Sequence, residues 1–179
     1  GHNLEVMPVI NKIDLPQAEP DRVKQEIDDL LGLDAIEAPM GSAKTGVGID
    51  ELLSSLVESI PSPKGNLDGP LKSLIIDSWF DSYLGVVSLI KIIDGSIQKG
   101  QKIKIFSTGQ TFTVDQVGIF TPKKTEMDQL SAGQVGYMVA GIKDIYGAPV
   151  GDTIIESKNE STLPLPGFKK VLPKVFASL

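Results

Sequence analysis

The first sixty residues alternate between two spacings of hydrophobic positions. Short apolar runs at residues 6–10 and about 35–40 are typical of buried strands, and Pro8 inside the first run favours an edge or irregular strand. Apolar residues three and four positions apart follow each run, which predicts helices over residues 20–31 and from about residue 49. The order strand, helix, strand, helix predicts a parallel sheet covered by helices. The predicted apolar faces are Val23, Ile27, Leu30 and Leu31 in the first helix, and Ile49, Leu52, Leu53, Leu56, Val57 and Ile60 in the second.

Residues 1–60 are therefore expected to be the C-terminal half of a larger α/β domain. Two strands cannot form a stable doubly wound sheet, which has about five or six. Gly1 and His2 resemble the remnant of a cleaved expression tag, which fits a truncated chain.

The spacing of hydrophobic positions changes after a linker. Residues 61–70 hold three prolines and two glycines, the composition of a connecting segment. Beyond it, apolar and polar positions alternate, and turn pairs such as Asp94-Gly95 separate the alternating runs. These short strands predict a closed β-barrel over residues 71–156, and the irregular residues 157–179 are expected to lead into an absent domain. The predicted barrel strands cover residues 73–79, 86–93, 101–106, 112–120, 134–140 and 153–156.

Composition removes several classes of chemistry. The 179 residues include no cysteine, which excludes disulfides, thiolate zinc sites, thiol nucleophiles and iron–sulfur clusters. The single histidine, His2, argues against a histidine-based triad or a multi-histidine metal site. The apolar runs are too short for a membrane-spanning helix and no signal peptide opens the chain, so a cytoplasmic location is expected.

Charge separates the two halves of the chain. Residues 1–60 carry 4 basic and 12 acidic residues, a net charge of −8, whereas residues 61–179 carry 13 and 11, a net charge of +2. The asymmetry indicates either two units with different surfaces or simply two solvated faces of different charge. A charge of this size does not by itself make the second half a nucleic-acid-binding domain.

A polar tetrad, Asn11-Lys12-Ile13-Asp14, directly follows the first predicted strand. The Asp14 carboxylate can accept from both the ring N–H and the exocyclic amine of guanine, a donor pair that adenine lacks. The aliphatic stem of Lys12 can cover the ring face, and Asn11 can tie neighbouring loops together. Since Asn and Asp also form ordinary turns after strands, the tetrad alone leaves both interpretations open.

A second polar segment, Ser42-Ala43-Lys44, follows the second predicted strand. The Ala43 N–H can donate to the guanine carbonyl oxygen, and Ser42 can hold its loop through a bond between side chain and backbone. The C-terminal ends of adjacent parallel strands are where open α/β sheets bind ligands. Together the two segments predict a guanine-binding site made of Asn11, Lys12, Asp14, Ser42, Ala43 and Lys44.

The sequence lacks the elements that hold phosphates. It contains no GxxxxGK(S/T) loop, and hence no DxxG switch that follows one. Phosphoryl transfer depends on such elements for positioning and charge stabilisation. We therefore expect this chain to have no catalytic or metal-binding residue, and neither to hydrolyse GTP nor to hold it tightly.

Residues 11–16 and 42–46 match the fourth and fifth guanine-nucleotide motifs of translational GTPases, and the whole of residues 4–179 resembles the LepA (elongation factor 4) family. A barrel turn that relatives share as Lys-Gly-Asp reads Lys99-Gly100-Gln101 here. The segments that most resemble LepA are 77–81, 83–87, 107–109, 118–123, 141–144, 147–153 and 165–169.

The resemblance implies a fold and an activity. Residues 1–60 would be the C-terminal part of the GTP-binding domain of a P-loop GTPase, an α/β fragment, followed by an all-β barrel of the translation-factor type. The full-length protein would hydrolyse GTP, with GTP or GDP and Mg²⁺ as its ligands. Its implied partners are the ribosome, through small-subunit rRNA and protein, and tRNA-bearing complexes. The family is linked to back-translocation or ribosome assembly and to peripheral association with the inner face of the membrane, and an organellar source also fits.

Several barrel residues keep two interpretations open. The cluster of Trp79, Phe80 and Tyr83 could stack on nucleobases. Alternatively, Trp79 and Phe80 pack the end of the barrel or the domain interface. The adjacent Lys123 and Lys124 either contact rRNA phosphates or belong to a solvated loop, and Lys143 is a further candidate for RNA contact.

Two expectations concern the chain as a whole. It is either a piece of a translational GTPase or a non-enzymatic ribosome- or RNA-binding barrel module without a nucleotide site. Because the incomplete sheet exposes a strand edge beside apolar surface, residues 1–60 are expected to be partly disordered or to self-associate.

Overall fold

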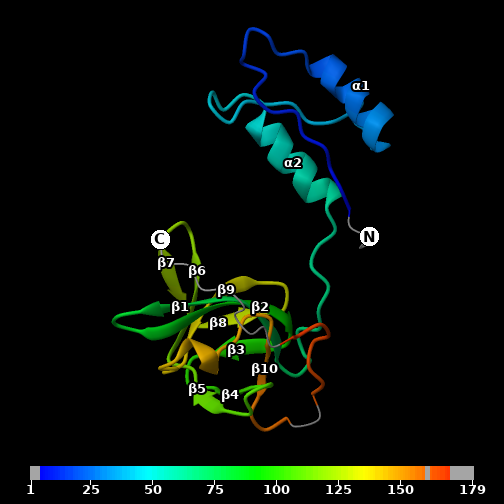
Figure 1. The fold of residues 1–179 in the computed structure, drawn as a ribbon. Coiled ribbons are helices and arrows are strands. Elements are labelled where there is room, and N and C mark those ends of the chain that lie inside the picture. Colours follow the sequence, from blue (N-terminus) through cyan, green and yellow to red (C-terminus); the bar gives the residue numbers. More distant parts are fainter. Residues whose placement is uncertain (1–4, 160–161, 170–179) are drawn as a thin grey trace, which may run out of the picture. The chain divides into compact units, whose positions relative to one another are not determined.

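The computed structural model describes residues 5–159 and 162–169, and it divides the chain between Ser62 and Pro63 into two compact units. The first unit contains both α-helices, and the second is built from strands (Figure 1). Gly1 and His2 lie outside the described residues.

The two helices of the first unit confirm the prediction from hydrophobic spacing. Helix α1 spans Pro20–Leu31, and helix α2 spans Ile49–Ser59. Pro20 occupies the first turn of α1, where its missing N–H leaves no bond unmade. Gly32 ends the helix with a left-handed φ of 64°, and its N–H donates to the Asp28 carbonyl.

The strands predicted at residues 6–10 and 35–40 are wrong as extended strands. Within the described residues, the two segments meet in a single parallel bridge between Ile10 and Met40. Ile10 N–H donates to the Pro39 carbonyl at 2.9 Å, and the Ile10 carbonyl accepts from Gly41 N–H at 2.9 Å. Pro8 and Pro39 lack the N–H that a longer ladder needs, and residues 36–37 form a turn, so the pairing ends at one bridge.

The first unit has a small core. Its buried apolar residues are Ile10, Ala35 and Ala38, with Ile13, Val23 and Ile27 packed against them. The C-terminal part of the α1 stripe is uncovered, since Leu30 is 79% exposed. Helix α2 contributes no buried residue, and its Val57 is also 79% exposed. These helices therefore present apolar faces that the described part of the unit does not cover.

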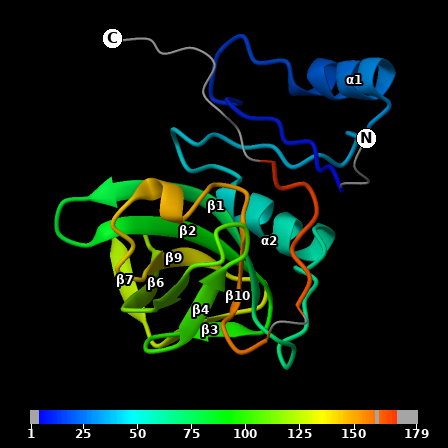
Figure 2. The same ribbon diagram turned by 60° about the horizontal axis from the view of Figure 1, so that its bottom comes forward.

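The second unit is an antiparallel barrel, and Figure 2 shows its strands curling around a common interior. An eight-stranded sheet has the order β5-β4-β10-β1-β2-β9-β6-β7, and β3 pairs with β8 separately. The buried core lies inside it and is dominated by isoleucines such as Ile75, Ile90 and Ile154. The strands are β1 Lys72–Asp81, β2 Gly85–Asp94, β3 Ser96–Gln98, β4 Lys102–Ile105, β5 Thr111–Thr113, β6 Gln116–Phe120, β7 Lys124–Met127, β8 Gln129–Ser131, β9 Val135–Val139 and β10 Thr153–Glu156.

The barrel departs from the predicted strands in two ways. The single strand predicted over residues 112–120 is two strands, because the chain changes partners at Val114 and Asp115. Val114 N–H donates to the Gln101 carbonyl, whereas Asp115 N–H donates to the Val139 carbonyl. The short strands β3, β7 and β8 were not predicted, and every residue of β7 is exposed, so it lacks the alternation that marks a strand.

Segments on both sides of the barrel strands are hydrogen-bonded to the barrel. Within the segment predicted as a linker, Asn66 N–H donates to Asp94 Oδ1 at 2.9 Å and the Asn66 carbonyl accepts from Gly95 N–H. After β10, Leu165 N–H donates to Thr153 Oγ1 at 2.9 Å. Residues 160–161 and 170–179 of the C-terminal segment lie outside the described residues.

A short 3₁₀ turn, η1 Ile145–Gly147, lies between β9 and β10. No helix in the described ranges is long and apolar enough to cross a membrane.

Candidate functional site

The bridge between Ile10 and Met40 sets two polar loops side by side at the ends of these segments. The loop after Ile10 carries Asn11, Lys12 and Asp14, and the loop after Met40 carries the Ser42-Ala43-Lys44 segment. A bond from Ile13 N–H to the Gly41 carbonyl, 3.3 Å long, continues the pairing. The fold therefore brings together all six residues that the sequence assigned to one site.

Ser42 connects the two loops through its side chain. It is completely buried, and its Oγ donates to Asp14 Oδ1 at 2.7 Å. The same oxygen accepts from Thr45 N–H at 3.2 Å, which is the bond between side chain and backbone expected from the sequence. Ser42 thus holds the otherwise exposed carboxylate of Asp14 in one position.

Asn11 makes the second connection between the loops. Its Oδ1 accepts from Lys12 N–H at 2.7 Å and from Ala43 N–H at 3.3 Å. Lys12 has a positive φ of 65°, which turns the chain sharply after Asn11. The Ala43 N–H, predicted to donate to a base, donates to Asn11 here, so a carbonyl ligand would replace the Asn11 oxygen.

Glycine permits the fold of the second loop. Gly48 has a φ of 73°, and a Cβ on it would lie 2.0 Å from the Met40 carbonyl oxygen. Ser42 N–H donates to the Val47 carbonyl at 2.9 Å, and Gly46 N–H donates to the Ser42 carbonyl at 2.8 Å. The loop is therefore closed by its own backbone before α2 begins.

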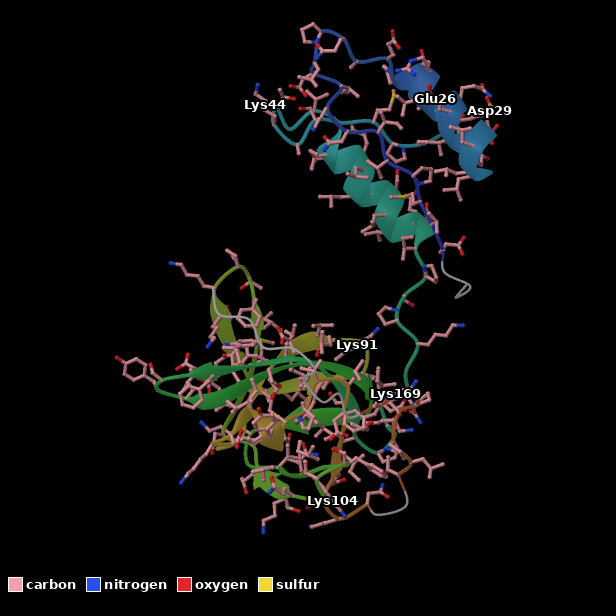
Figure 3. The ribbon with its side chains drawn as sticks, viewed as in Figure 1. Glu26, Asp29, Lys44, Lys91, Lys104 and Lys169 are labelled. Carbon is pink, nitrogen blue, oxygen red and sulfur yellow. The ribbon has the colours of Figure 1, made fainter. Side chains whose placement is uncertain are left out.

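A cavity of about 370 Å³ lies between the two loops. Its lining combines the Asp14 carboxylate, the Asn11 amide and the side chains of Lys12 and Lys44. Figure 3 shows Lys44 extending outward from its loop. The cavity can hold a planar polar group, with acceptors at one edge and aliphatic lysine stems beside its face. The lining residues are Asn11, Lys12, Asp14, Leu15, Ser42, Ala43 and Lys44.

The residues that the structure describes do not fit a magnesium–phosphate site. No group of three or more His, Asp or Glu side chains within residues 5–159 and 162–169 could hold a metal ion. The sequence also supplies no glycine-rich phosphate loop.

An aromatic cluster on the barrel consists of Trp79, Phe120 and Tyr137. Trp79 packs on Val87, Tyr137 and Val139, and its ring centroid lies 6.2 Å from that of Phe120. This matches the packing interpretation for Trp79. Phe80 and Tyr83, in contrast, are 64% and 96% exposed.

Lys124 packs over this aromatic cluster. Its Nζ lies 6.0 Å from the Trp79 ring centroid, 5.8 Å from the Tyr137 centroid and 3.6 Å from Asp81 Oδ2. Bonds from the backbone N–H groups of Tyr83 and Leu84, together with the nearby Lys124, lower the pKa of Asp81, and burial raises the pKa of Tyr137. No sequence signal links Lys124 to Trp79, Asp81 and Tyr137, because β7 supplies the lysine while β1 and β9 supply the other three.

A pocket at the end of the barrel was also missed by the sequence. It lies between the β4–β5 turn and the residues that follow β9. Of its lining residues, only Lys143 had been singled out as a candidate for RNA contact. Several of the others lie in segments that resemble LepA, but only the fold brings the lining residues together.

Comparisons with known proteins find a matching family model for each unit. Residues 1–62 match the family model described as the elongation factor Tu GTP binding domain, and residues 85–155 match the model described as elongation factor Tu domain 2. The fold is similar to a crystal structure of translation elongation factor SelB from Methanococcus maripaludis in its apo form, with a TM-score of 0.67 and 19% sequence identity. That match covers 87% of this chain and 34% of the SelB chain, so this chain spans about a third of the length of its structural relative.

Proposed function

We propose that this chain, which joins part of a GTP-binding domain of the elongation factor Tu type to the domain 2 barrel of the same type, carries the guanine-recognition loops and the ribosome-contacting barrel of a LepA-like translational GTPase. The observation that carries the proposal is the buried Ser42 hydroxyl, which fixes the Asp14 carboxylate beside the Asn11 loop. LepA is proposed on the sequence segments that resemble that family.

Guanine fits the cavity through matched donors and acceptors. The Asp14 carboxylate accepts from the ring N–H and the exocyclic amine, and the Ala43 N–H donates to the carbonyl oxygen once Asn11 releases it. The stems of Lys12 and Lys44 lie over the base and keep their ammonium groups in water. Adenine offers neither the donor pair nor the carbonyl.

The full-length protein is proposed to bind GTP or GDP with Mg²⁺ and to hydrolyse GTP. The phosphate- and metal-binding residues for that reaction are not in this chain, so its own residues bind and orient the base. When bound, Mg²⁺ would supply charge neutralisation at the phosphates.

The proposed partners follow from the same assignment. The barrel is proposed to contact the small ribosomal subunit during work on tRNA-bearing complexes, and the protein to be cytoplasmic with peripheral association at the inner face of the membrane. The uncovered apolar faces of α1 and α2 support self-association of the chain as it stands.

Base recognition can be tested on the 179-residue chain with nucleosides, which avoid the missing phosphate site. Saturation-transfer NMR at millimolar concentration should give a stronger signal for guanosine than for adenosine. The Asp14→Asn variant should lose this preference, whereas Asp29→Asn, on the exposed side of α1 (Figure 3), should keep it. Equal signals for the two nucleosides with the unmodified chain would reject the guanine site and favour a barrel module without a nucleotide site.

A further inference from the structure

A second pocket, of about 430 Å³, opens at the end of the barrel, and none of its lining residues belongs to the guanine loops. Its walls come from the β4–β5 hairpin on one side and from the loop between β9 and η1 on the other. The side chains that define it are Gln110, Phe112, Ile142, Lys143, Asp144 and Tyr146.

The floor of this pocket belongs to the barrel core. Phe112 lies in the edge strand β5 opposite Ile103, and it packs against the core together with the buried Ile142. A Cβ on Gly147 would lie 2.9 Å from Ile142 Cγ2 and 3.9 Å from Phe112 Cζ. Because Gly147 has no side chain, the wall at this point is backbone and the apolar floor stays open.

The rim presents an aromatic ring on a fixed turn. The Tyr146 N–H donates to Asp144 Oδ1 at 3.0 Å, and the Gly147 N–H donates to the Asp144 carbonyl at 2.8 Å. Although its backbone is held in this way, Tyr146 is 77% exposed. Lys143, the residue before this turn, is exposed and forms no salt bridge within the part of the chain that the structure describes.

These groups match the parts of an unpaired nucleotide. An exposed aromatic ring stacks on any base, and proteins that bind single strands combine such rings with nearby cations for the phosphates. Gln110 can donate and accept at a base edge, and Asp144 has a second carboxylate oxygen beyond the one that caps the turn. An apolar peptide side chain would not use the amide, the carboxylate and the ammonium together.

We propose that this pocket binds one unpaired nucleobase of single-stranded RNA, with the base stacked on Tyr146 over the Phe112 floor and its phosphate next to Lys143. The inference deepens the proposed contact of the barrel with ribosomal RNA and rests on it. It assigns that contact to the β5–η1 end of the barrel rather than to the packed Trp79 cluster.

Binding of a fluorescein-labelled single-stranded RNA decamer to the 179-residue chain, followed by anisotropy, tests the proposal. Tyr146→Ala and Lys143→Ala should each weaken binding roughly five-fold or more, and Tyr146→Phe should bind as the parent does because the ring is kept. The matched controls are Tyr83→Ala, 96% exposed at the β1–β2 turn, and Lys99→Ala, in the turn before β4; both should bind within two-fold of the parent (roughly the error of such titrations).

Each result decides the assignment. The assignment is overturned if the pocket and control variants lose RNA affinity equally, or if Tyr146→Ala binds RNA as the parent does. It is also overturned if the chain binds a duplex of the same sequence equally well. Competition by a peptide rather than by unlabelled RNA would assign the pocket to protein. Sedimentation of the chain with small ribosomal subunits tests the proposed function separately. If the chain pellets with the subunits regardless of Tyr146 and Lys143, the pocket assignment alone is rejected. If the chain binds RNA but does not pellet with the subunits, the ribosome contact is rejected.

Discussion

The hydroxyl of Ser42 donates a 2.7 Å hydrogen bond to Oδ1 of Asp14, although 28 residues separate the two in the chain. Ser42 is fully buried, so the bond is shielded from water while most of the Asp14 side chain is not. A single hydroxyl therefore connects the folding of one loop to the position of the carboxylate in the other.

Ser42→Ala should destabilise the first unit by about 1–3 kcal/mol, because Thr45 N–H and Asp14 both lose their buried partner. Both described α-helices lie in the first unit and the single tryptophan lies in the barrel, so circular dichroism at 222 nm and tryptophan fluorescence report the two units separately. Only the unfolding transition followed at 222 nm should shift. The control Ser54→Ala, at an exposed position of α2, should leave both transitions unchanged.

Replacement of Asp14 should change base preference in the full-length protein. Asp14→Ala should lower guanine nucleotide affinity by a few kcal/mol, roughly the value of two charge-assisted hydrogen bonds. Asp14→Asn should shift the preference toward xanthine, since its amide N–H can donate to the carbonyl that replaces the amine. Nucleotide competition assays measure both. An Asn variant that prefers GTP over XTP as strongly as the parent would show that Asp14 does not read the base.

Gly48→Ala should prevent the second loop from closing. The new Cβ would meet the Met40 carbonyl oxygen at 2.0 Å, in addition to the cost of a φ of 73°. We expect a loss of the α-helical signal at 222 nm with the barrel fluorescence retained. Gly46→Ala is the matched control, because its φ of 82° is equally unfavourable but no atom lies within 4 Å of its Cβ. Gly46→Ala should lower the free energy of unfolding of the first unit by about 1 kcal/mol. Equal effects of the two changes would mean that strain rather than the collision matters.

The Asp81 carboxylate should make the barrel sensitive to acid. Its pKa is lowered in the folded protein by the Tyr83 and Leu84 N–H groups and by Lys124, from an ordinary value of 3.8. The contribution of Asp81 to the free energy of unfolding is therefore complete above pH 3.8. It is lost as the pH falls through the lower pKa that Asp81 has in the folded protein. In urea titrations followed by fluorescence, Asp81→Asn should be less stable than the parent at pH 6, and the difference should shrink below pH 3.8. A difference that stays constant down to pH 2 would assign the effect to another group.

The chain should self-associate through its first unit. Sedimentation velocity should show a weight-average mass that rises with concentration and with salt, because salt screens the net charge of −8 on residues 1–60. Val57→Glu, at a position 79% exposed on α2, should restore the monomer, whereas Leu67→Glu, 65% exposed in the second unit, should not. Hydrogen exchange should show residues 5–60 less protected than the barrel. A strictly monomeric chain with equal protection in both units would contradict this prediction.

The sequence predicted the elements whose signals are local. Helix α1 begins at Pro20 and ends before Gly32, where the start and stop signals of a helix occur in the sequence itself. A parallel strand carries no such signal, because its hydrogen bonds depend on neighbours, and residues 6–10 pair only through Ile10. Strand β7 could not be predicted for a related reason: its four residues are all exposed and have no apolar face.

The sequence predicted which residues make up the candidate site, but not which of them are hydrogen-bonded to one another. Two motifs after two apolar runs identified Asp14 and Ser42, yet nothing in their spacing shows that one donates to the other. The same holds for the Ala43 N–H, whose partner in the structure is Asn11. The sequence predicted Lys143 as a candidate for RNA contact but not the pocket that it lines with Tyr146, because the pocket walls come from segments that only the barrel topology makes neighbours.

The pairing of β1 with β10 places Lys72 opposite Ile155, residues at the two ends of the barrel sequence. During synthesis from the N-terminus, β1 must wait for β10 before its second edge is paired, so the barrel can close only after almost its whole sequence has been made. Loop closure over such a separation makes folding slow relative to a helical domain of the same size. Until β10 arrives, a nascent chain exposes the unpaired edge of β1, and that interval is when protection by a chaperone would matter most.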